Sequence, residues 1–207
     1  MSSAKGKLVL ILGLQRTGTT LLASMLGGHS EVNMLFESVG SDTTSLIGKK
    51  ISANKLLVYR QIRLTQRASR LGHLINRIVN LDFKIKNKHH RKRPYPTSKL
   101  SIKDYEKLGC KFIIIERDEK SSIDSMMSRA KQSFAEAKNE YDKGTLILTK
   151  VKALDSHTIS FLDLVNNTEI TLKNICEFLE IDFEKRMLEG PKYNFVYPNE
   201  KVIRKTS

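Results

Sequence analysis

The chain has 207 residues, 40% of which are hydrophobic, and its formal net charge is +14. That length is enough for one domain with a sizeable core, and no apolar run approaches the roughly 20 residues that a membrane-spanning helix needs. The positive charge attracts many kinds of polyanion, but no nucleic-acid-binding motif accompanies it, so we expect no specific nucleic-acid partner.

The N-terminal residues and the cysteines indicate a compartment. The sequence MSSAKGK leads directly into the first apolar run, so we expect no signal peptide and a cytoplasmic protein. Cys110 and Cys176 lie far apart, each in an apolar segment. This arrangement favours buried free thiols over a disulfide or a metal site.

The stretch from Leu8 to Leu26 predicts a buried strand, a tight glycine loop and a helix that begins inside the loop. Backbone N–H groups at a helix start have no partner within the helix, and the helix dipole adds positive potential there. The unit is therefore an anion-binding site by construction. Its loop reads Gly13-Leu14-Gln15-Arg16-Thr17-Gly18-Thr19-Thr20.

The spacing from Gly13 to Gly18 is that of a phosphate-binding loop, but the ending differs. Thr19 stands where nucleoside triphosphatases have the lysine that reaches the β- and γ-phosphates. A basic residue, Arg16, appears earlier, inside the loop. This departure disfavours triphosphate chemistry, although a P-loop kinase with a degenerate motif remains the alternative.

The segment GLQRTGTTLL resembles the 5′-phosphosulfate loop of sulfotransferases that use 3′-phosphoadenosine 5′-phosphosulfate (PAPS). In that family the loop is a basic residue followed by Ser/Thr-Gly-Thr-Thr. The resemblance implies that Arg16 stabilises the charge that develops on the bridging oxygen. It also implies a set of loop residues that bind the 5′ end of the donor: Gln15, Arg16, Thr17, Gly18, Thr19 and Thr20.

A short apolar segment from Val32 to Phe36 predicts the second strand, which ends at Glu37. The resemblance implies that this glutamate is the base that removes the acceptor's proton. An exposed glutamate at a strand end is the alternative. His29, in the preceding turn, is expected to be a turn residue rather than a catalytic one.

Residues 41–100 read as helical and basic, and we expect them to form an insertion that carries the acceptor region. A solvated helical face followed by a flexible basic loop is the alternative. The basic run covers residues 84–93. The apolar residues that recur at helical spacing are Leu71, Leu74, Ile75, Ile78 and Val79.

A second motif begins at Lys111, where a β-branched run predicts a buried parallel strand. Arg117 follows it, and one amphipathic helix is expected from about Ile123 to Tyr141. In sulfotransferases an arginine at this place and a serine eight residues later bind the 3′-phosphate. Arg117 and Ser125 match that spacing.

The last third of the sequence predicts a short strand near residues 159–161 and a helix with a buried stripe that contains Leu172 and Ile175. The C-terminal tail contains Arg204 and Lys205. The resemblance implies that these two residues fold over the 3′-phosphate, whereas a frayed basic terminus is the alternative.

These features predict an α/β fold, a single P-loop-type domain over residues 1–207 with a central, mostly parallel sheet flanked by helices. The resemblance implies transfer of a sulfuryl group from PAPS to a hydroxyl or amine, without a metal. A kinase or another nucleotide-binding protein, and a non-catalytic anion-binding relative, are the alternatives. The acceptor (small molecule, carbohydrate, lipid or peptide tyrosine) and the oligomeric state stay open.

Overall fold

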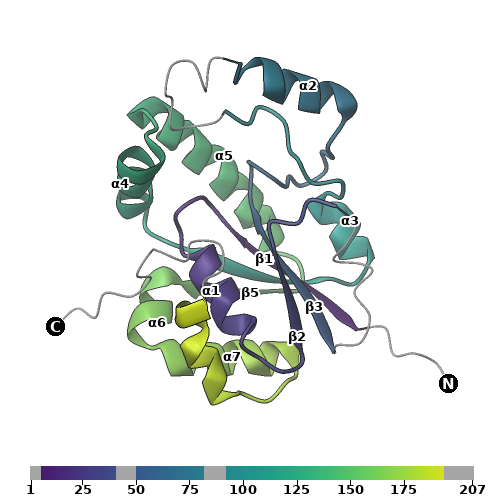
Figure 1. The fold of residues 1–207 in the computed structure, drawn as a ribbon, viewed down its shortest axis with the longest axis vertical. Helices are drawn as coiled ribbons and strands as arrows, with labels where there is room; N and C mark the ends of the chain where they lie inside the picture. The colour runs from purple at the N-terminus through teal and green to yellow at the C-terminus, as the bar shows by residue number, and fades with distance from the viewer. Residues whose placement is uncertain (1–5, 41–49, 82–91, 194–207) are drawn as a thin grey trace.

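A computed structural model describes residues 6–40, 50–81 and 92–193 of the chain. A five-stranded sheet runs through the middle, and helices cover both of its faces (Figure 1). The strand order is β2-β3-β1-β4-β5, and every pair of neighbouring strands is parallel. This confirms the predicted α/β fold class. The strands are β1 Lys7–Gly13, β2 Val32–Phe36, β3 Ile51–Leu57, β4 Lys111–Glu116 and β5 Ser156–Ser160.

The core consists of two apolar layers that share the sheet. Successive side chains of a strand point to opposite faces, so Val9 and Ile11 of β1 belong to one layer while Leu10 and Leu12 belong to the other. All four are fully buried, as expected for a strand with both faces covered. The first layer lies under α1 Thr19–Leu26, α7 Thr168–Leu179 and the 3-10 helix η2 Lys185–Tyr193, and the second under α3 Ile102–Lys107 and α5 Phe134–Val151.

The expectation of a helical segment starting near residue 41 is wrong for residues 51–57. They form β3, which lies between β2 and β1. Three polar side chains obscured the strand pattern in the sequence, yet all three are buried: Ser52, Asn54 and Lys55. The helical spacing further along is confirmed by α2 Arg70–Ile78.

The single helix expected between Ile123 and Tyr141 is in fact two helices. The first ends where Lys131 adopts a left-handed backbone, with a φ of 55°. Ser133 then starts the second through a capping box with Glu136, in which each side chain bonds the other residue's backbone N–H. Ile123 of the first helix packs against the second. The two helices are α4 Glu119–Ala130 and α5 Phe134–Val151.

Smaller expectations also have outcomes in the structure. Cys110 and Cys176 are buried free thiols, and burial raises the pKa of the Cys176 thiol to about 11. His29 is 4% exposed and lies in the turn after α1, where its Nδ1 accepts the N–H of Glu31. Within the described ranges, no helix has the length and apolar character needed to cross a bilayer.

Candidate active site

The loop between β1 and α1 is held by one hydrogen bond from the segment after β3 and one within the loop itself. The carbonyl of Gly13 accepts the N–H of Val58 at 3.0 Å, and Thr17 Oγ1 donates to the carbonyl of Leu14 at 2.9 Å. Thr17 and Thr19 are buried and act as the scaffold of the loop. The half-buried positions alternate with them and are the ones a ligand can reach: Gln15, Arg16, Gly18 and Thr20.

The start of α1 is open to an anion. Gly18 is the N-cap residue, so no side chain caps the first turn, and no acidic residue lies in that turn. First-turn N–H groups have no acceptor within the helix. Together with the helix dipole they give this helix start a positive potential, and binding of an anion there stays a prediction.

Gly18 is required by both its backbone and its surroundings. Its φ is 98°, a conformation that L side chains rarely adopt. A Cβ at this position would lie 2.5 Å from Cδ2 of Phe161, far inside van der Waals contact. The loop therefore reaches its shape only because position 18 has no side chain.

The second motif lies directly beside this loop. β4 is the neighbour of β1, so Arg117, which follows β4, comes out at the same edge of the sheet. Nη1 of Arg117 donates to the carbonyl of Arg16 at 3.2 Å, and its guanidinium stacks 4.7 Å from the ring centre of Phe161. Ser125 Oγ accepts a hydrogen bond from Nε of Arg16 at 3.4 Å. Two guanidinium groups and a hydroxyl thus converge next to the start of α1.

The convergence brings together residues about a hundred positions apart in the sequence. Arg16, which the resemblance assigned to the 5′ end of the donor, contacts Ser125, which it assigned to the 3′ end. The two predicted anion sites are therefore adjacent. Which anion each residue binds stays a prediction.

The start of α4 differs from that of α1. Asp118 is its N-cap residue, and Oδ1 of Asp118 accepts the N–H of Ser121 at 2.8 Å. That backbone hydrogen bond, above all, holds the pKa of the Asp118 carboxyl below its usual range. Because Asp118 occupies this helix start, an anion beside α4 would be held by the side chains of Arg117 and Ser125 rather than by α4 amides.

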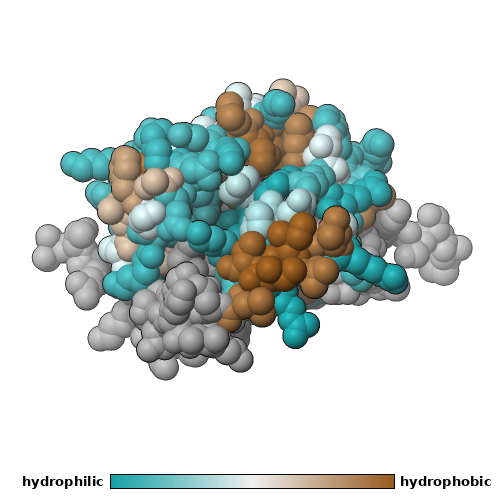
Figure 2. Space-filling view, turned by 90° about the horizontal axis from the view of Figure 1, so that it is seen from above, coloured by the Kyte–Doolittle hydropathy of each residue, from teal (hydrophilic) through white to brown (hydrophobic). Residues whose placement is uncertain are grey.

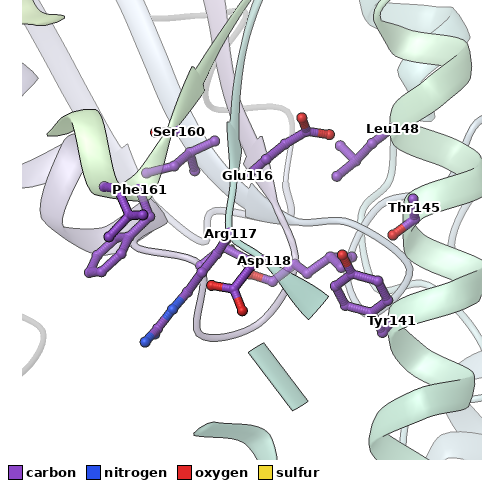
Figure 3. A pocket seen from close by; sticks show the side chains of 12 residues that line it. Glu116, Arg117, Asp118, Tyr141, Thr145, Leu148, Ser160 and Phe161 are labelled. Atoms are coloured by element: carbon purple, nitrogen blue, oxygen red, sulfur yellow. Dashed lines mark hydrogen bonds between the residues drawn. The ribbon is translucent and has the colours of Figure 1, made fainter. Parts of the chain in front are cut away.

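A cavity of about 390 Å³ opens beside Arg117, within the size range of small-ligand sites. In Figure 3 the labelled side chains of α5 reach toward it from one side, while Ser160 and Phe161 border it on the other. The wall is mixed, with apolar, aromatic and hydroxyl groups, the guanidinium of Arg117 and the carboxylates of Glu116 and Asp118. Its lining includes Leu14, Thr17, Arg117, Tyr141, Leu148 and Phe161.

Glu37 lies directly after β2, as expected, and its side chain is 35% exposed, but both of its carboxylate oxygens have partners. One of its carboxylate oxygens forms an ion pair with Nζ of Lys55, and the other accepts Nε2 of Gln61 at 2.7 Å. β3 separates β2 from β1, so Glu37 is about two strand spacings, roughly 10 Å, from the end of β1. Its role as a base stays a prediction.

The sequence reasoning missed Lys55 and Gln61. Lys55 is 2% exposed, and burial lowers the pKa of its ammonium while the nearby Glu37 carboxylate opposes that shift. Gln61 ties Glu37 to β3, because its Oε1 accepts the N–H of Leu57 at 2.7 Å. The sequence does contain a signal for Lys55, which is a lysine inside an apolar run. That signal can be interpreted only when residues 51–57 are known to form a central strand.

Backbone strain marks the same edge of the sheet. Among the described residues, five non-glycine residues have a positive φ. Three of them lie within three residues of the ends of β1, β2 and β3, namely Arg16, Glu37 and Tyr59. Left-handed backbone in such residues costs free energy and clusters at functional sites. Arg204 and Lys205, the other predicted donor-binding residues, lie outside the described part of the chain.

Comparisons with known proteins agree on the architecture. No family model and no curated protein matches the chain in sequence. Among solved structures, the mouse sulfotransferase SULT7A1 complexed with PAP has a TM-score of 0.56 and 14% identity, and the match covers 95% of this chain and 66% of that one.

Two further matches are sulfotransferase domains of biosynthetic enzymes. The domain from the curacin biosynthetic pathway has a TM-score of 0.51 and 19% identity over 89% of this chain and 77% of that one. The domain from the Synechococcus PCC 7002 olefin synthase has a TM-score of 0.51 and 19% identity over 90% and 78% of the two chains. The fold of this chain is therefore the P-loop α/β fold of the sulfotransferases.

Proposed function

We propose that the protein is a PAPS-dependent sulfotransferase that moves a sulfuryl group to a hydroxyl or amine of its acceptor. The observation that carries this proposal is the convergence of Arg16, Arg117 and Ser125 beside the open start of α1. An adenine nucleotide with phosphate groups at both its 5′ and 3′ positions offers an anion to each half of such a site. The PAP complex of the mouse enzyme with this fold supports that reading.

In the proposed binding mode the 5′ end of the donor lies at the start of α1, held by loop amides and the hydroxyl of Thr20, while the buried Thr19 supports the loop. Arg117 and Ser125 hold the 3′-phosphate, because a guanidinium can give a phosphate two parallel N–H donors. The 390 Å³ cavity beside Arg117 has room for the nucleoside, and the ring of Phe161 borders it.

In the proposed reaction the acceptor oxygen or nitrogen attacks sulfur, and the bond from sulfur to the bridging oxygen breaks. The electron pair of that bond stays on the 5′-phosphate. Arg16 and the loop amides stabilise the negative charge that develops there, an electrostatic contribution that is often worth 10²–10³ in rate. The proton of the acceptor goes to Glu37, whose carboxylate Lys55 and Gln61 hold in place.

The acceptor region is assigned to the described parts of residues 41–100. The turn after β3 and α2 lie beyond the ends of β2 and β3 (Figure 1), and Gln61 of that turn donates a hydrogen bond to Glu37 at 2.7 Å. Hydrogen bonds from the N–H groups of Thr97 and Ser98 to the carbonyl of Gln61 tie the return segment to that turn. An acceptor bound there would have its hydroxyl close to Glu37.

The test is calorimetric titration of the protein with 3′-phosphoadenosine 5′-phosphate and, separately, with ADP in the presence of magnesium, so that the two affinities can be compared. We expect the bisphosphate to bind more tightly, and Arg117→Ala to weaken its binding roughly 10- to 100-fold, as for loss of a charged hydrogen-bond donor. Binding of adenosine 5′-phosphosulfate, which has no 3′-phosphate, should change little. Arg129→Ala, an exposed arginine on α4, is the matched control.

Three outcomes would overturn the proposal or part of it. Equal losses for both nucleotides would remove Arg117 from the 3′-phosphate site. Magnesium-dependent binding of ADP or ATP without any preference for a 3′-phosphate would favour a kinase. Tight binding of the donor without product release in any acceptor screen would indicate a non-catalytic relative.

A further inference from the structure

Helix α2 turns its apolar side away from the protein. Leu71, Leu74 and Ile78 recur at helical spacing, and their exposed fractions are 64%, 53% and 52%. The turn that follows continues this surface with Val79 at 39% and Leu81 at 65%. Seen from the α2 side of the molecule, Figure 2 shows a hydrophobic patch near the centre of the view. We call these five residues the α2 face.

Specific contacts on the opposite side of the helix fix this orientation. Asn76 is buried, and its side-chain amide both donates to the carbonyl of Tyr95, at 3.0 Å, and accepts the N–H of Tyr95, at 3.1 Å. Asn80 makes the same paired contact with the backbone of Lys92, at 2.9 Å in each direction. A Cβ on Gly72 would lie 3.0 Å from Cβ of Tyr95, so the helix also approaches closely there.

This arrangement reverses the usual one. A surface helix of a globular protein ordinarily buries its apolar stripe and exposes its polar residues. Here two asparagines hold the polar side against the protein, and the α2 face is left to solvent. Apolar side chains gathered on the outer side of one helix are a candidate interaction surface.

The charge around the α2 face indicates its partner. Arg70 and Arg77 are exposed on the same helix, seven residues apart, and neither forms an ion pair with another described residue. In the sequence from Lys50 to Lys103 the only acidic residue is Asp82. A short helix with an apolar side, arginines beside it and little acid nearby has the composition of helices that lie in a membrane interface.

We propose that the α2 face docks on the surface of an anionic lipid bilayer. The apolar side chains would enter the boundary between headgroups and acyl chains, while Arg70 and Arg77 meet the anionic headgroups. The helix lies on the bilayer and does not cross it. This proposal does not depend on the proposed sulfuryl transfer, because the α2 face contains none of the residues assigned to the donor.

A second copy of the chain fits the face less well. The nine residues of α2 form a helix roughly 14 Å long and 10 Å wide, a footprint of about 140 Å². A stable interface buries about 800 Å² on each partner, which is far more. A symmetric pairing through α2 would also bring the arginines of both copies together. An anionic surface complements that charge, whereas another α2 face does not.

The experiment is co-sedimentation of the full chain with vesicles of phosphatidylcholine alone or mixed with phosphatidylserine. We expect binding to the mixed vesicles, weaker binding at high salt, and little binding to phosphatidylcholine alone. The triple variant Leu71→Gln, Leu74→Gln, Ile78→Gln should bind at least roughly tenfold more weakly, since three side chains lose their apolar contact. Arg70→Gln with Arg77→Gln should also lose roughly tenfold or more.

Matched controls separate this surface from general basic charge. Leu146→Gln with Ile170→Gln removes equally exposed apolar side chains elsewhere, and Lys107→Gln with Lys150→Gln removes the same charge elsewhere. These variants should bind vesicles like the wild type, and circular dichroism should show intact helices in all four. Equal losses in test and control variants, or no binding to the anionic vesicles, would overturn the proposal. So would light scattering that shows a dimer of the wild type but not of the triple variant.

Discussion

Two regions at the carboxyl edge of the sheet use their side chains in opposite ways. In the first, the proposed donor edge, Arg16 contacts both Arg117 and Ser125 beside the start of α1. In the second, α2 directs Leu71, Leu74 and Ile78 outward and makes its specific contacts through two asparagines. Both regions gave clear sequence signals. The difference teaches that the spacing of apolar residues in the sequence identifies a helix. The groups that the helix contacts in the fold decide which of its sides faces solvent.

Glu37 follows the edge strand β2, and its replacement should have the largest effect. Glu37→Gln keeps the shape of the side chain but removes its negative charge and its ability to take a proton. If Glu37 is the base, we expect turnover to fall roughly 10²- to 10⁴-fold with donor affinity largely kept. Steady-state kinetics with labelled donor, once an acceptor is found, measure this.

The control for that variant is Glu31→Gln. Glu31 pairs with Lys50 just before β2, at the opposite end of the strand, and is half exposed. The Glu31→Gln variant should leave turnover unchanged. If Glu37→Gln turns over like the wild type, another group takes the proton, and the ion pair between Glu37 and Lys55 is structural.

The donor edge can be broken at Gly18. Gly18→Ala places a Cβ 2.5 Å from Phe161 in a left-handed backbone, so we expect the free energy of unfolding to fall by about 2–5 kcal/mol. Gly109→Ala is the comparison, because Gly109 also has a positive φ, 73°, but a Cβ there meets nothing within 4 Å. That variant should lose only about 1–2 kcal/mol. Chemical denaturation measures both, and equal losses would mean that the contact with Phe161 relaxes freely.

The smallest effect is expected where the α2 region joins the rest of the protein. Nε of Arg67, just before α2, donates to Oδ2 of Asp104 at 2.6 Å, and Asp104 also completes the capping box of α3 with Ser101. The Arg67 hydrogen bonds, above all, hold the pKa of the Asp104 carboxyl well below its usual range. Asp104→Asn should lower the free energy of unfolding at neutral pH by about 1 kcal/mol.

The pH dependence of that loss has a definite sign. A carboxyl whose pKa is lower in the folded state stabilises the fold above its unfolded pKa of about 4 and loses that contribution as the pH falls below it. The gap between the wild type and Asp104→Asn should therefore close in acid. Asp124→Asn, on the exposed side of α4, should show a smaller gap at neutral pH. A gap that stays constant with pH would contradict the assigned cause.

Much of this structure could be predicted because its signals are local. The glycine loop, the strand before it and the strand before Arg117 each lie within one short segment, and the eight-residue spacing of Arg117 and Ser125 needs only one loop and the start of one helix. The break between α4 and α5 was missed although its signal, the capping box from Ser133 to Glu136, is also local. Apolar residues recur at helical spacing from Ile123 to Tyr141, and this longer pattern predicted one helix in spite of the capping box inside it.

The sequence by itself determined the parallel α/β architecture and the glycine loop that leads into α1, because apolar runs and glycine spacing constrain the backbone directly. Only the tertiary structure decided that residues 51–57 form a central strand, since their polar side chains become buried through contacts with distant segments. It also decided the pairing of Glu37 with Lys55 and the outward turn of α2. Those features depend on which groups meet across the sheet edge, and no single segment contains both partners.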